Sequence, residues 1–339
     1  MSFPFLTGTA KQKPQAPVPL PECVADHQKD PRWNPAHYEM DQPLTDAVNV
    51  ALLLQKPLLV TGSPGTGKTQ LAYRVAWELG LDEPIRFDTK STSTARDVLY
   101  RYNTLGRFHA AQTKEGSQRS LDYLEYVGLG KAIVLSQPTA AVQHLLPPDF
   151  THTGPKRHVV LVDEIDKAPR DFPNDLLREI DEKRFRIVEL GNQEQEIQAN
   201  DAYWPVLILT SNSEQNLPDA FLRRCVYYHI PPPDKKKYLK IVGARIPNLL
   251  AAPPNDTLIN SALDFFLALK DVRLSRMPAT AELLDWLETL QGAFQANPAH
   301  PLEALPMETL VQTLGTLAKT DKDCEALSNV IKRRQSHSA

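Results

Sequence analysis

The sequence predicts an α/β fold in which helices cover both faces of a parallel sheet, followed by a smaller all-helical domain. Four short, almost purely apolar segments alternate with stretches of helical periodicity, a pattern typical of a parallel sheet that is buried on both faces. After the three prolines at 231–233 the strand signals stop, and only helical patterns follow. A glycine-rich loop between the first apolar segment and a helix also indicates this fold.

The expected elements are placed along the chain by their apolar spacing. The strands are short apolar runs, expected at 57–61, 84–88, 158–162 and 206–210. The helices of the first domain are expected at 45–54, 70–79 and 96–111. Gly80 is a stop signal for the second of them. The helices of the second domain are expected at 238–245, 258–269, 280–290, 307–317 and 323–333.

Charge and cysteine usage exclude several classes of protein. The chain has 339 residues and a formal net charge of −3, from 38 Lys and Arg against 41 Asp and Glu. This balance excludes an overall field that would draw the protein onto nucleic acid or anionic lipid, although it leaves room for a local patch. Three widely spaced cysteines argue against a disulfide framework or a Cys-type zinc site. Without a secretory signal or an apolar run of membrane-spanning length, we expect a soluble, cytoplasmic protein.

Three regions are expected: a Pro-rich arm at 1–43, the α/β domain at 44–233 and the helical domain at 234–339. The first region contains eight prolines, which remove hydrogen-bond donors and favour extended backbone. Two interpretations of this arm stay open. It is either a mobile tail or a segment that lies on a neighbouring subunit.

The loop from Gly62 to Thr69 reads GSPGTGKT and fits the GxxxxGK[ST] phosphate-loop pattern. Its glycines let main-chain N–H groups turn toward phosphate oxygens, and the N-terminus of the next helix adds partial positive charge. Lys68 is expected to neutralise the β- and γ-phosphates, and the Thr69 hydroxyl to bind Mg²⁺. The candidate nucleotide-binding residues of this segment are Gly62, Ser63, Pro64, Gly65, Thr66, Gly67, Lys68, Thr69 and Gln70.

Two carboxylates, Asp163 and Glu164, follow the third apolar strand. A carboxylate at this point can hold the Mg²⁺ shell, and its neighbour can orient and polarise an attacking water. We assign the first role to Asp163 and the second to Glu164. Solvated acids end many strands, and it is the phosphate loop upstream that favours the catalytic interpretation. The adjacent Asp166 and Lys167 are expected to be surface or helix-capping residues.

Polar residues after the fourth strand complete the candidate site. Asn212 follows this strand beside the strand of Asp163, and from there it can reach the γ-phosphate or the water, although an isolated Asn is more often a turn former. Arg223 and Arg224 end a short helix. Because arginine matches phosphate bidentately, either can stabilise transition-state charge in trans, with Arg224 preferred. The alternative is that both arginines cap the helix C-terminus.

These four elements, in this order, resemble the AAA+ ATPases, and their detailed sequences resemble the MoxR branch. The matching strings are TGSPGTGKT (61–69), VLVDEIDKAPRDFPNDLLREID (160–181), LILTSN (207–212) and LPDAFLRRC (217–225), within a resemblance that covers roughly residues 44–292. The resemblance implies the P-loop NTPase (AAA+) fold. It assigns Walker A to Gly62–Thr69, Walker B to Asp163 and Glu164, sensor 1 to Asn212 and the arginine finger to Arg224 or Arg223.

Two insertions extend the resemblance. Residues 92–131, with Tyr100, Tyr102 and Phe108, resemble the helix-2 insert of that clade, and plain packing of a helical insert is an open alternative for these rings. Residues 182–203 alternate around a Gly-Asn turn as a hairpin and resemble the pre-sensor-1 hairpin of the family. In related ATPases both insertions project toward a pore or client.

The resemblance implies Mg²⁺-dependent hydrolysis of ATP by a homo-oligomeric ring, in the family commonly a hexamer, with ATP between the sheet domain and a helical lid. In the lid, Arg276 resembles the sensor-2 arginine that contacts nucleotide, with a plain surface cation as the alternative. MoxR-type ATPases are commonly chaperone-like and remodel a protein client, often beside a von Willebrand A domain protein. Two other classes stay open. A nucleic-acid motor or loader is disfavoured by the charge balance, and an ATP-gated scaffold with little turnover by Glu164.

Overall fold

The computed structural model describes residues 34–113, 119–191, 196–213, 217–246, 257–292 and 296–338. The chain forms two compact units, which are described one at a time: Met40–Pro231, and Pro232–Ala339 with the N-terminal residues up to Glu39. The domain limits predicted at 43 and 233 stay predictions. None of the described helices combines the length and the apolar character that crossing a bilayer needs.

The last prolines of the expected arm begin helices instead of extending the chain. Pro35 starts the 3₁₀ turn η2 (Pro35–His37), and Pro43 stands in the first turn of α1 (Gln42–Leu54). Proline is tolerated there because the N–H that it lacks has no partner within a first helical turn. Asn34 and Asp41 cap these two elements with their side chains. Residues 1–33 of the arm lie outside the described residues.

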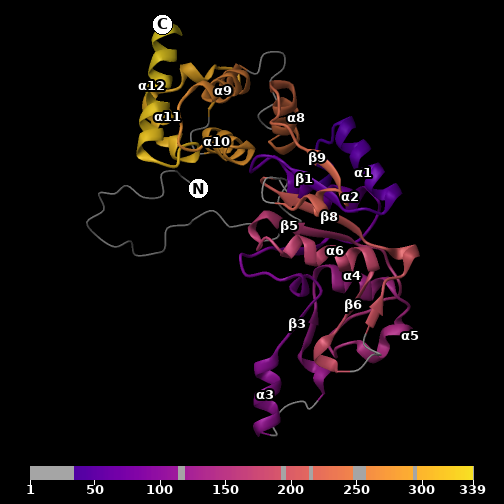
Figure 1. The fold of residues 1–339 in the computed structure, drawn as a ribbon. Coiled ribbons are helices and arrows are strands. Elements are labelled where there is room, and N and C mark those ends of the chain that lie inside the picture. The colour runs from indigo at the N-terminus through magenta and orange to yellow at the C-terminus, as the bar shows by residue number, and fades with distance from the viewer. Residues whose placement is uncertain are drawn as a thin grey trace. The chain divides into compact units, whose positions relative to one another are not determined.

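The first unit is built on a five-stranded parallel sheet with the order β2-β5-β8-β1-β9 (Figure 1). The strands are β1 (Leu58–Thr61), β2 (Ile85–Asp88), β5 (Val159–Asp163), β8 (Val206–Ser211) and β9 (Val226–His229). The three central strands β1, β5 and β8 are buried along their whole length, as predicted for a sheet covered on both faces. Because all five strands run parallel, the loops after them lie at one edge of the sheet.

The strand β9 is a fifth strand where the sequence predicts four. It pairs with β1 at the edge of the sheet, and Thr61 lies opposite His229. Its burial alternates, since Val226 and Tyr228 are half-buried while Tyr227 and His229 are exposed. An edge strand of this kind lacks the continuous apolar run by which the central strands are recognised.

Helices connect the strands and cover the sheet. α2 (Lys68–Glu78) packs on β5 and β8, α4 (Gly128–Ser136) on β2 and β5, and α1 on β9 and β1. α6 (Phe172–Glu182) places Phe172, Leu176 and Ile180 in the same core as the central strands. The other short elements of this unit are α5 (Thr139–Val142), α7 (Asp219–Leu222), η4 (Ser120–Tyr123), η5 (Gln143–Leu145), η6 (Ile165–Lys167), η7 (Val188–Leu190) and η9 (Asp201–Tyr203).

The helix predicted over 96–111 is confirmed from residue 104 onward and is wrong before it. This stretch forms the 3₁₀ turn η3 (Ala95–Val98), the strand β3 (Tyr100–Tyr102) and the helix α3 (Thr104–Thr113), and β3 pairs with β4 (Leu124–Tyr126). Tyr100 is only 1% exposed, whereas Phe108 on α3 is 61% exposed, so the aromatic residues do not share one helical face. Asn103 precedes α3 and stabilises its start, because the Asn103 side chain accepts a hydrogen bond from the N–H of Gly106 at 2.8 Å.

The alternating segment at 184–198 forms the expected antiparallel pair. β6 (Arg184–Arg186) pairs with β7 (Glu196–Gln198), and Phe185 lies opposite Ile197. Asn192, in the turn, lies outside the described residues. Glu189, which follows β6, contacts the other insertion, since its carboxylate accepts from Tyr100 at 2.8 Å and from Arg96 at 2.9 Å. The two insertions are therefore joined to each other.

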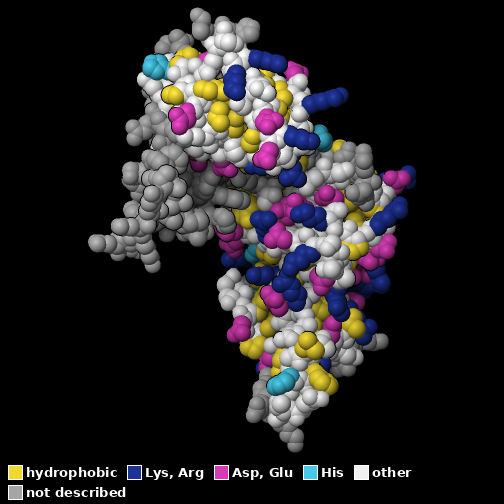
Figure 2. All heavy atoms as spheres, turned by 90° about the vertical axis from the view of Figure 1, so that its left-hand side faces the viewer, with side chains coloured by type: hydrophobic (Ala, Val, Ile, Leu, Met, Phe, Trp, Pro, Cys, Tyr) yellow, Lys and Arg dark blue, Asp and Glu magenta, His cyan; other side chains and the backbone are white. Residues whose placement is uncertain are grey.

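Charged side chains of both signs are scattered over the face of the molecule drawn in Figure 2. On the face drawn in Figure 2, Lys and Arg side chains are interspersed with Asp and Glu, and neither sign forms a continuous band. This mixing agrees with the near-zero net charge of the sequence.

The second unit is helical, as predicted. It contains α8 (Lys235–Arg245), α9 (Thr257–Ala268), α10 (Thr280–Gly292), α11 (Met307–Thr313) and α12 (Asp321–Ser338), with the turns η11 (Leu269–Asp271), η12 (Leu302–Ala304) and η13 (Leu314–Thr316). Its core is centred on Phe265 and Trp286, whose ring centroids lie 5.5 Å apart. α11 ends four residues earlier than expected, and η13 continues the predicted helix.

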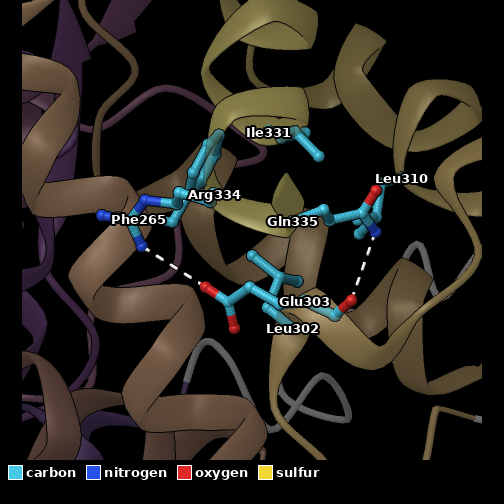
Figure 3. Close-up of a pocket in the computed structure, with 7 residues that line it drawn as sticks. All are labelled: Phe265, Leu302, Glu303, Leu310, Ile331, Arg334 and Gln335. Atoms are coloured by element: carbon cyan, nitrogen blue, oxygen red, sulfur yellow. Dashed lines mark hydrogen bonds and ion pairs between the residues drawn. The ribbon is translucent and has the colours of Figure 1, made fainter. Parts of the chain in front are cut away.

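A small pocket of about 10 Å³ lies between α12 and η12 (Figure 3). Its polar lining residues bind one another or nearby main chain, since Gln335 donates to the carbonyl oxygens of Glu303 and Leu305 at 3.2 and 2.9 Å, and Arg334 lies 3.6 Å from the Glu303 carboxylate. A space of this size holds about one water. These contacts hold α12 on η12.

Candidate active site

The phosphate loop connects β1 to α2 and depends on glycine at three positions. Gly62, Gly65 and Gly67 have φ angles of +149°, +74° and +88°, which side chains rarely adopt. A Cβ on Gly62 would also lie 2.8 Å from the main-chain oxygen of Ile230. Gly67 is the N-cap of α2, and no described side chain caps this helix. The first N–H groups of α2 are thus oriented as in a phosphate-binding helix terminus.

Lys68 is buried at the start of α2, with 7% of its surface exposed. Its ammonium donates to the carbonyl oxygens of Gly62 and Ser63 at 2.8 and 3.0 Å and to Oδ1 of Asn212 at 2.8 Å. An ammonium has three donors, so these bonds use all of them. Burial lowers the pKa of Lys68 from its ordinary value, against the opposing effect of nearby carboxylates. To bind a phosphate oxygen, Lys68 must exchange at least one of its three partners.

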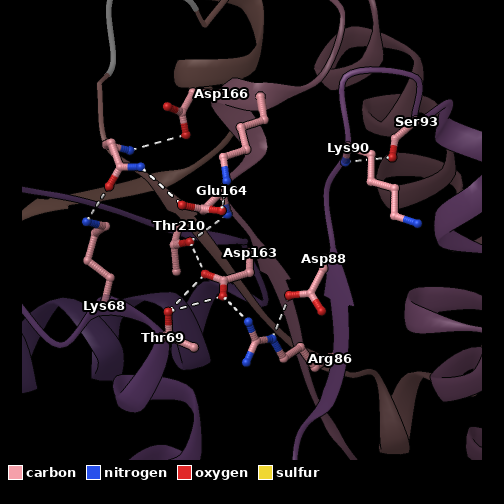
Figure 4. Close-up of polar contacts among 12 residues, drawn as sticks. Lys68, Thr69, Arg86, Asp88, Lys90, Ser93, Asp163, Glu164, Asp166 and Thr210 are labelled. Carbon is pink, nitrogen blue, oxygen red and sulfur yellow. Dashed lines mark hydrogen bonds and ion pairs between the residues drawn. The ribbon is translucent and has the colours of Figure 1, made fainter. Parts of the chain in front are cut away.

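Asp163 ends β5 and receives hydrogen bonds on both carboxylate oxygens (Figure 4). The Thr69 hydroxyl lies 3.1 Å from Oδ1 and 3.2 Å from Oδ2. The Thr210 hydroxyl donates to Oδ1 at 2.6 Å, and a guanidinium nitrogen of Arg86 lies 3.0 Å from Oδ2. The structure therefore brings together Thr69 and Asp163, the two residues predicted to hold magnesium.

Glu164 follows Asp163 and has a φ angle of +55°, which is uncommon outside glycine. Its N–H donates to the Thr210 hydroxyl at 2.9 Å, which supports this conformation. Its carboxylate accepts from the Lys167 ammonium and, at 3.4 Å, from Nδ2 of Asn212. The hydrogen bond from Lys167 holds the pKa of Glu164 below its ordinary value of 4.5. Glu164 is therefore a carboxylate at neutral pH, as a base for water activation must be.

Asn212, just past the end of β8, lies between the phosphate loop and Glu164. Its Oδ1 accepts from Lys68 and its Nδ2 donates to Glu164, while its own N–H donates to Oδ1 of Asp166 at 3.2 Å. The amide orientation follows from these partners, because Lys68 can only donate and a carboxylate only accept. Lys167 is exposed and Asp166 half-buried, and each also binds a residue of the candidate site, which the sequence did not predict.

Two more residues of the network, Thr210 and Arg86, were not among the predicted site residues. Thr210 is a buried polar residue near the end of an otherwise apolar strand, and that contrast is a signal that the sequence does contain. Arg86 interrupts the apolar pattern of β2. Its role depends on the pairing of β2 with β5, which places Asp88 opposite Asp163, and the sequence does not specify this pairing.

The predicted arginines lie outside this network. Arg224 donates from Nε to Asp181 at 2.9 Å and from Nη1 to the carbonyl oxygen of Ala220 at 3.1 Å. Arg223 is exposed. Its main-chain N–H donates to the carbonyl oxygen of Asp219 at 3.1 Å, while its side chain forms no hydrogen bond or ion pair with the described residues. Arg276 is exposed in the loop before α10 of the second unit. The finger and sensor-2 assignments therefore stay predictions.

A magnesium nucleotide fits the residues of this site. The glycine conformations and the uncapped start of α2 supply the main-chain donors that phosphate requires. Thr69 and Asp163, with oxygens 3.1 Å apart, are hard oxygen ligands. Magnesium is commonly bound by one or two carboxylates together with substrate phosphates and water.

Comparison with known families agrees with this geometry. Residues 57–225 match the family model described as AAA domain (dynein-related subfamily). A search of curated proteins finds no match to the chain. The matched range contains the phosphate loop, both carboxylates and Asn212, and it covers four of the five strands of the parallel sheet. Residues 57–225 therefore form an AAA+ domain with the P-loop NTPase fold.

Proposed function

We propose that this protein is a Mg²⁺-dependent ATPase that works as a ring-shaped homo-oligomer, of six subunits as in related proteins, and remodels a protein partner. The observation that supports hydrolysis best is the continuous hydrogen-bonded set of Lys68, Asn212 and Glu164, next to the pair of Thr69 and Asp163. A site that only bound nucleotide would need the phosphate loop but not a deprotonated, oriented glutamate.

Each side chain has a distinct task in this reaction. Lys68 and the loop N–H groups bind the phosphates, and Lys68 gives up a main-chain or amide partner to do so. Thr69 and Asp163 would hold Mg²⁺, which when bound neutralises charge on the phosphate oxygens. Glu164 orients water and accepts its proton as the water oxygen bonds to the γ-phosphorus and the bond to ADP breaks. Asn212 positions the Glu164 carboxylate.

The ring arrangement rests on the arginines after α7. Arg223 and Arg224 are both exposed, and a guanidinium is the group that best matches a phosphate on a neighbouring subunit. A head-to-tail contact of this kind uses two different surfaces of each subunit and closes into a ring. Arg224 is our first choice for the finger, and its ion pair with Asp181 would have to open for that role.

We infer a protein partner from the MoxR-like sequences of the motifs, together with the two insertions that contact each other through Glu189. A chaperone-like activity on a client, beside a von Willebrand A domain protein, is the form of this proposal that we favour. The charges on the insertions are mixed, since Arg96 pairs with Glu189 and Arg184 with Glu196. The insertions therefore do not offer the basic surface that a nucleic-acid motor needs.

The test is ATP hydrolysis by the purified protein, with and without Mg²⁺, together with its mass in solution when saturated with ATP. We expect Mg²⁺-dependent phosphate release and an oligomer. Glu164→Gln should retain ATP without turnover, and Lys90→Ala, which changes an exposed lysine near the site, is the matched control. A protein that binds no ATP, or stays monomeric with ATP, contradicts the proposal. ATPase stimulation by DNA with strong salt dependence would replace the client by nucleic acid.

A further inference from the structure

The carboxylate of Asp163 is already surrounded by three hydrogen-bond donors. A carboxylate offers about four lone-pair sites. In this structure Thr210 donates to Oδ1 and Arg86 donates to Oδ2, while the single hydroxyl hydrogen of Thr69 is shared between the two oxygens. The side chain of Asp163 is 8% exposed, so little water competes for these sites. A cation that binds Asp163, directly or through its water, therefore competes with these three partners, and most strongly with the positively charged one.

Arg86 is the partner that can leave. Thr210 is fully buried and also accepts from the N–H of Glu164, so its movement would break two bonds. Thr69 is itself an expected ligand of the metal. Arg86 is 38% exposed, and it carries the positive charge that a divalent cation would replace and repel.

A second carboxylate is in place to keep Arg86. The Nε of Arg86 lies 2.7 Å from Oδ1 of Asp88, a side chain that is 67% exposed and two residues away on β2. The guanidinium thus bridges a buried acid and an exposed acid through different nitrogens (Figure 4). If it releases Asp163, its charge remains paired at the surface.

We propose that Arg86 occupies Asp163 as a positive placeholder, that Mg²⁺-nucleotide binding displaces it onto Asp88, and that Arg86 thereby sets how much Mg²⁺ the site requires. This inference rests on the proposed function, because it assumes that the site takes a magnesium nucleotide. Arg86 is a positioning residue in this proposal, since it acts through Asp163. Without Mg²⁺, Arg86 keeps the buried carboxylate of Asp163 paired. A buried carboxylate without a partner would destabilise the folded protein.

The test measures binding of the non-hydrolysable analogue AMP-PNP by titration calorimetry over a range of Mg²⁺ concentrations. Arg86→Gln removes the competing cation, and we expect the Mg²⁺ concentration for half-maximal binding to fall about tenfold, as for loss of one charge-assisted hydrogen bond. Asp88→Asn removes the surface partner, and the midpoint should rise. Arg178→Gln, an exposed arginine of α6 that pairs with Glu182, should leave it unchanged.

A double variant separates displacement from a simple change of the local field. If Asp88 acts only by holding Arg86, Asp88→Asn will have no effect in the Arg86→Gln background. The proposal is overturned if the shifts of the two single variants add in the double variant, or if the Arg86→Gln midpoint is unchanged or higher. The proposed function survives these outcomes as long as the wild type binds the nucleotide. A wild-type protein that binds no AMP-PNP at any Mg²⁺ concentration overturns both. Because Asp88 is exposed, its variant can be measured even if Arg86→Gln does not fold, and an Asp88→Asn midpoint that fails to rise overturns the proposal.

Discussion

The Lys68 ammonium donates to Oδ1 of Asn212 at 2.8 Å, across 144 positions of the sequence. The other end of the same amide lies 3.4 Å from the Glu164 carboxylate. One side chain therefore contacts both the residue expected to bind phosphate and the residue expected to activate water. A phosphate that draws Lys68 away from Asn212 also changes the set of contacts that orients Glu164, which links binding to catalysis.

Replacing Lys68 by Ala should weaken ATP binding by about two orders of magnitude or more, because a buried charge-assisted contact to phosphate is lost. Binding of a fluorescent ATP analogue measures this. Lys90→Ala removes an exposed lysine after β2 and should bind normally. Near-normal affinity in Lys68→Ala would contradict the assignment of the phosphate loop.

Replacing Asn212 by Ala should leave ATP affinity within a few-fold of the wild type and lower kcat by about tenfold to a hundredfold. The reason is that Glu164 loses the amide that orients it, whereas Lys68 keeps two carbonyl partners and its place in the loop. Steady-state phosphate release, with KM and kcat separated, is the measurement. A change in KM alone would show that Asn212 only binds substrate.

Much of the fold could be predicted because its central strands are buried on both faces. β1, β5 and β8 are continuous apolar runs, and runs of this kind are visible without any tertiary information. The edge strand β9 has alternating burial and aromatic residues, and it escaped prediction. The stretch at 96–111 was misassigned before residue 104 because its apolar spacing fits a helix, while the burial of Tyr100 against the neighbouring insertion decides its strand conformation.

The candidate site divides in the same way. The phosphate loop, the two acids after β5 and Asn212 after β8 are local patterns at strand ends, so the sequence reveals them. Arg86 and Lys167 could not be predicted, because a charged residue near a strand or turn is normally solvated. Only the pairing of β2 with β5, and the left-handed backbone at Glu164 before the turn η6, bring these two cations to the acids.

Lys167→Met should shift the acidic limb of the ATPase pH profile to higher pH. Lys167 holds the pKa of Glu164 below 4.5, mainly through its hydrogen bond, so its loss raises that pKa. Glu164 must be deprotonated to accept a proton, and activity therefore disappears at a higher pH as the solution is acidified. The profile of kcat from about pH 3 to 8, which extends below the ordinary pKa of a glutamate, measures the shift. Arg178→Gln, far from Glu164 in the hydrogen-bond network, should keep the wild-type profile.

Mixtures of Glu164→Gln and Arg224→Ala subunits should recover activity that neither variant has alone. A subunit with an intact Glu164 then meets an intact Arg224 from its neighbour at about a quarter of the contacts of a randomly mixed ring, which predicts about a quarter of wild-type turnover. Phosphate release after co-incubation measures it.

The neighbouring arginine provides the control for this experiment. Arg223→Ala alone should keep most of its activity if Arg224 is the finger. The opposite result is an active Arg224→Ala and an inactive Arg223→Ala whose activity is recovered in mixtures with Glu164→Gln. It would make Arg223 the arginine finger in place of Arg224. No recovery in either mixture would contradict a shared site.

Trp286→Ala should destabilise the helical unit by about 3–5 kcal/mol, the usual cost of deleting a large buried aromatic side chain. Trp286 is 0% exposed, packs 5.5 Å from Phe265 between ring centroids, and donates its indole N–H to Thr313 at 2.9 Å. Deletion leaves both a cavity and a buried hydroxyl without that partner. Urea unfolding followed by circular dichroism measures the loss.

Trp77→Ala is the matched control, because Trp77 is 53% exposed on α2 and contacts Arg74, and it should cost about 1 kcal/mol or less. Equal losses in the two variants would contradict the central place of Trp286 in its core.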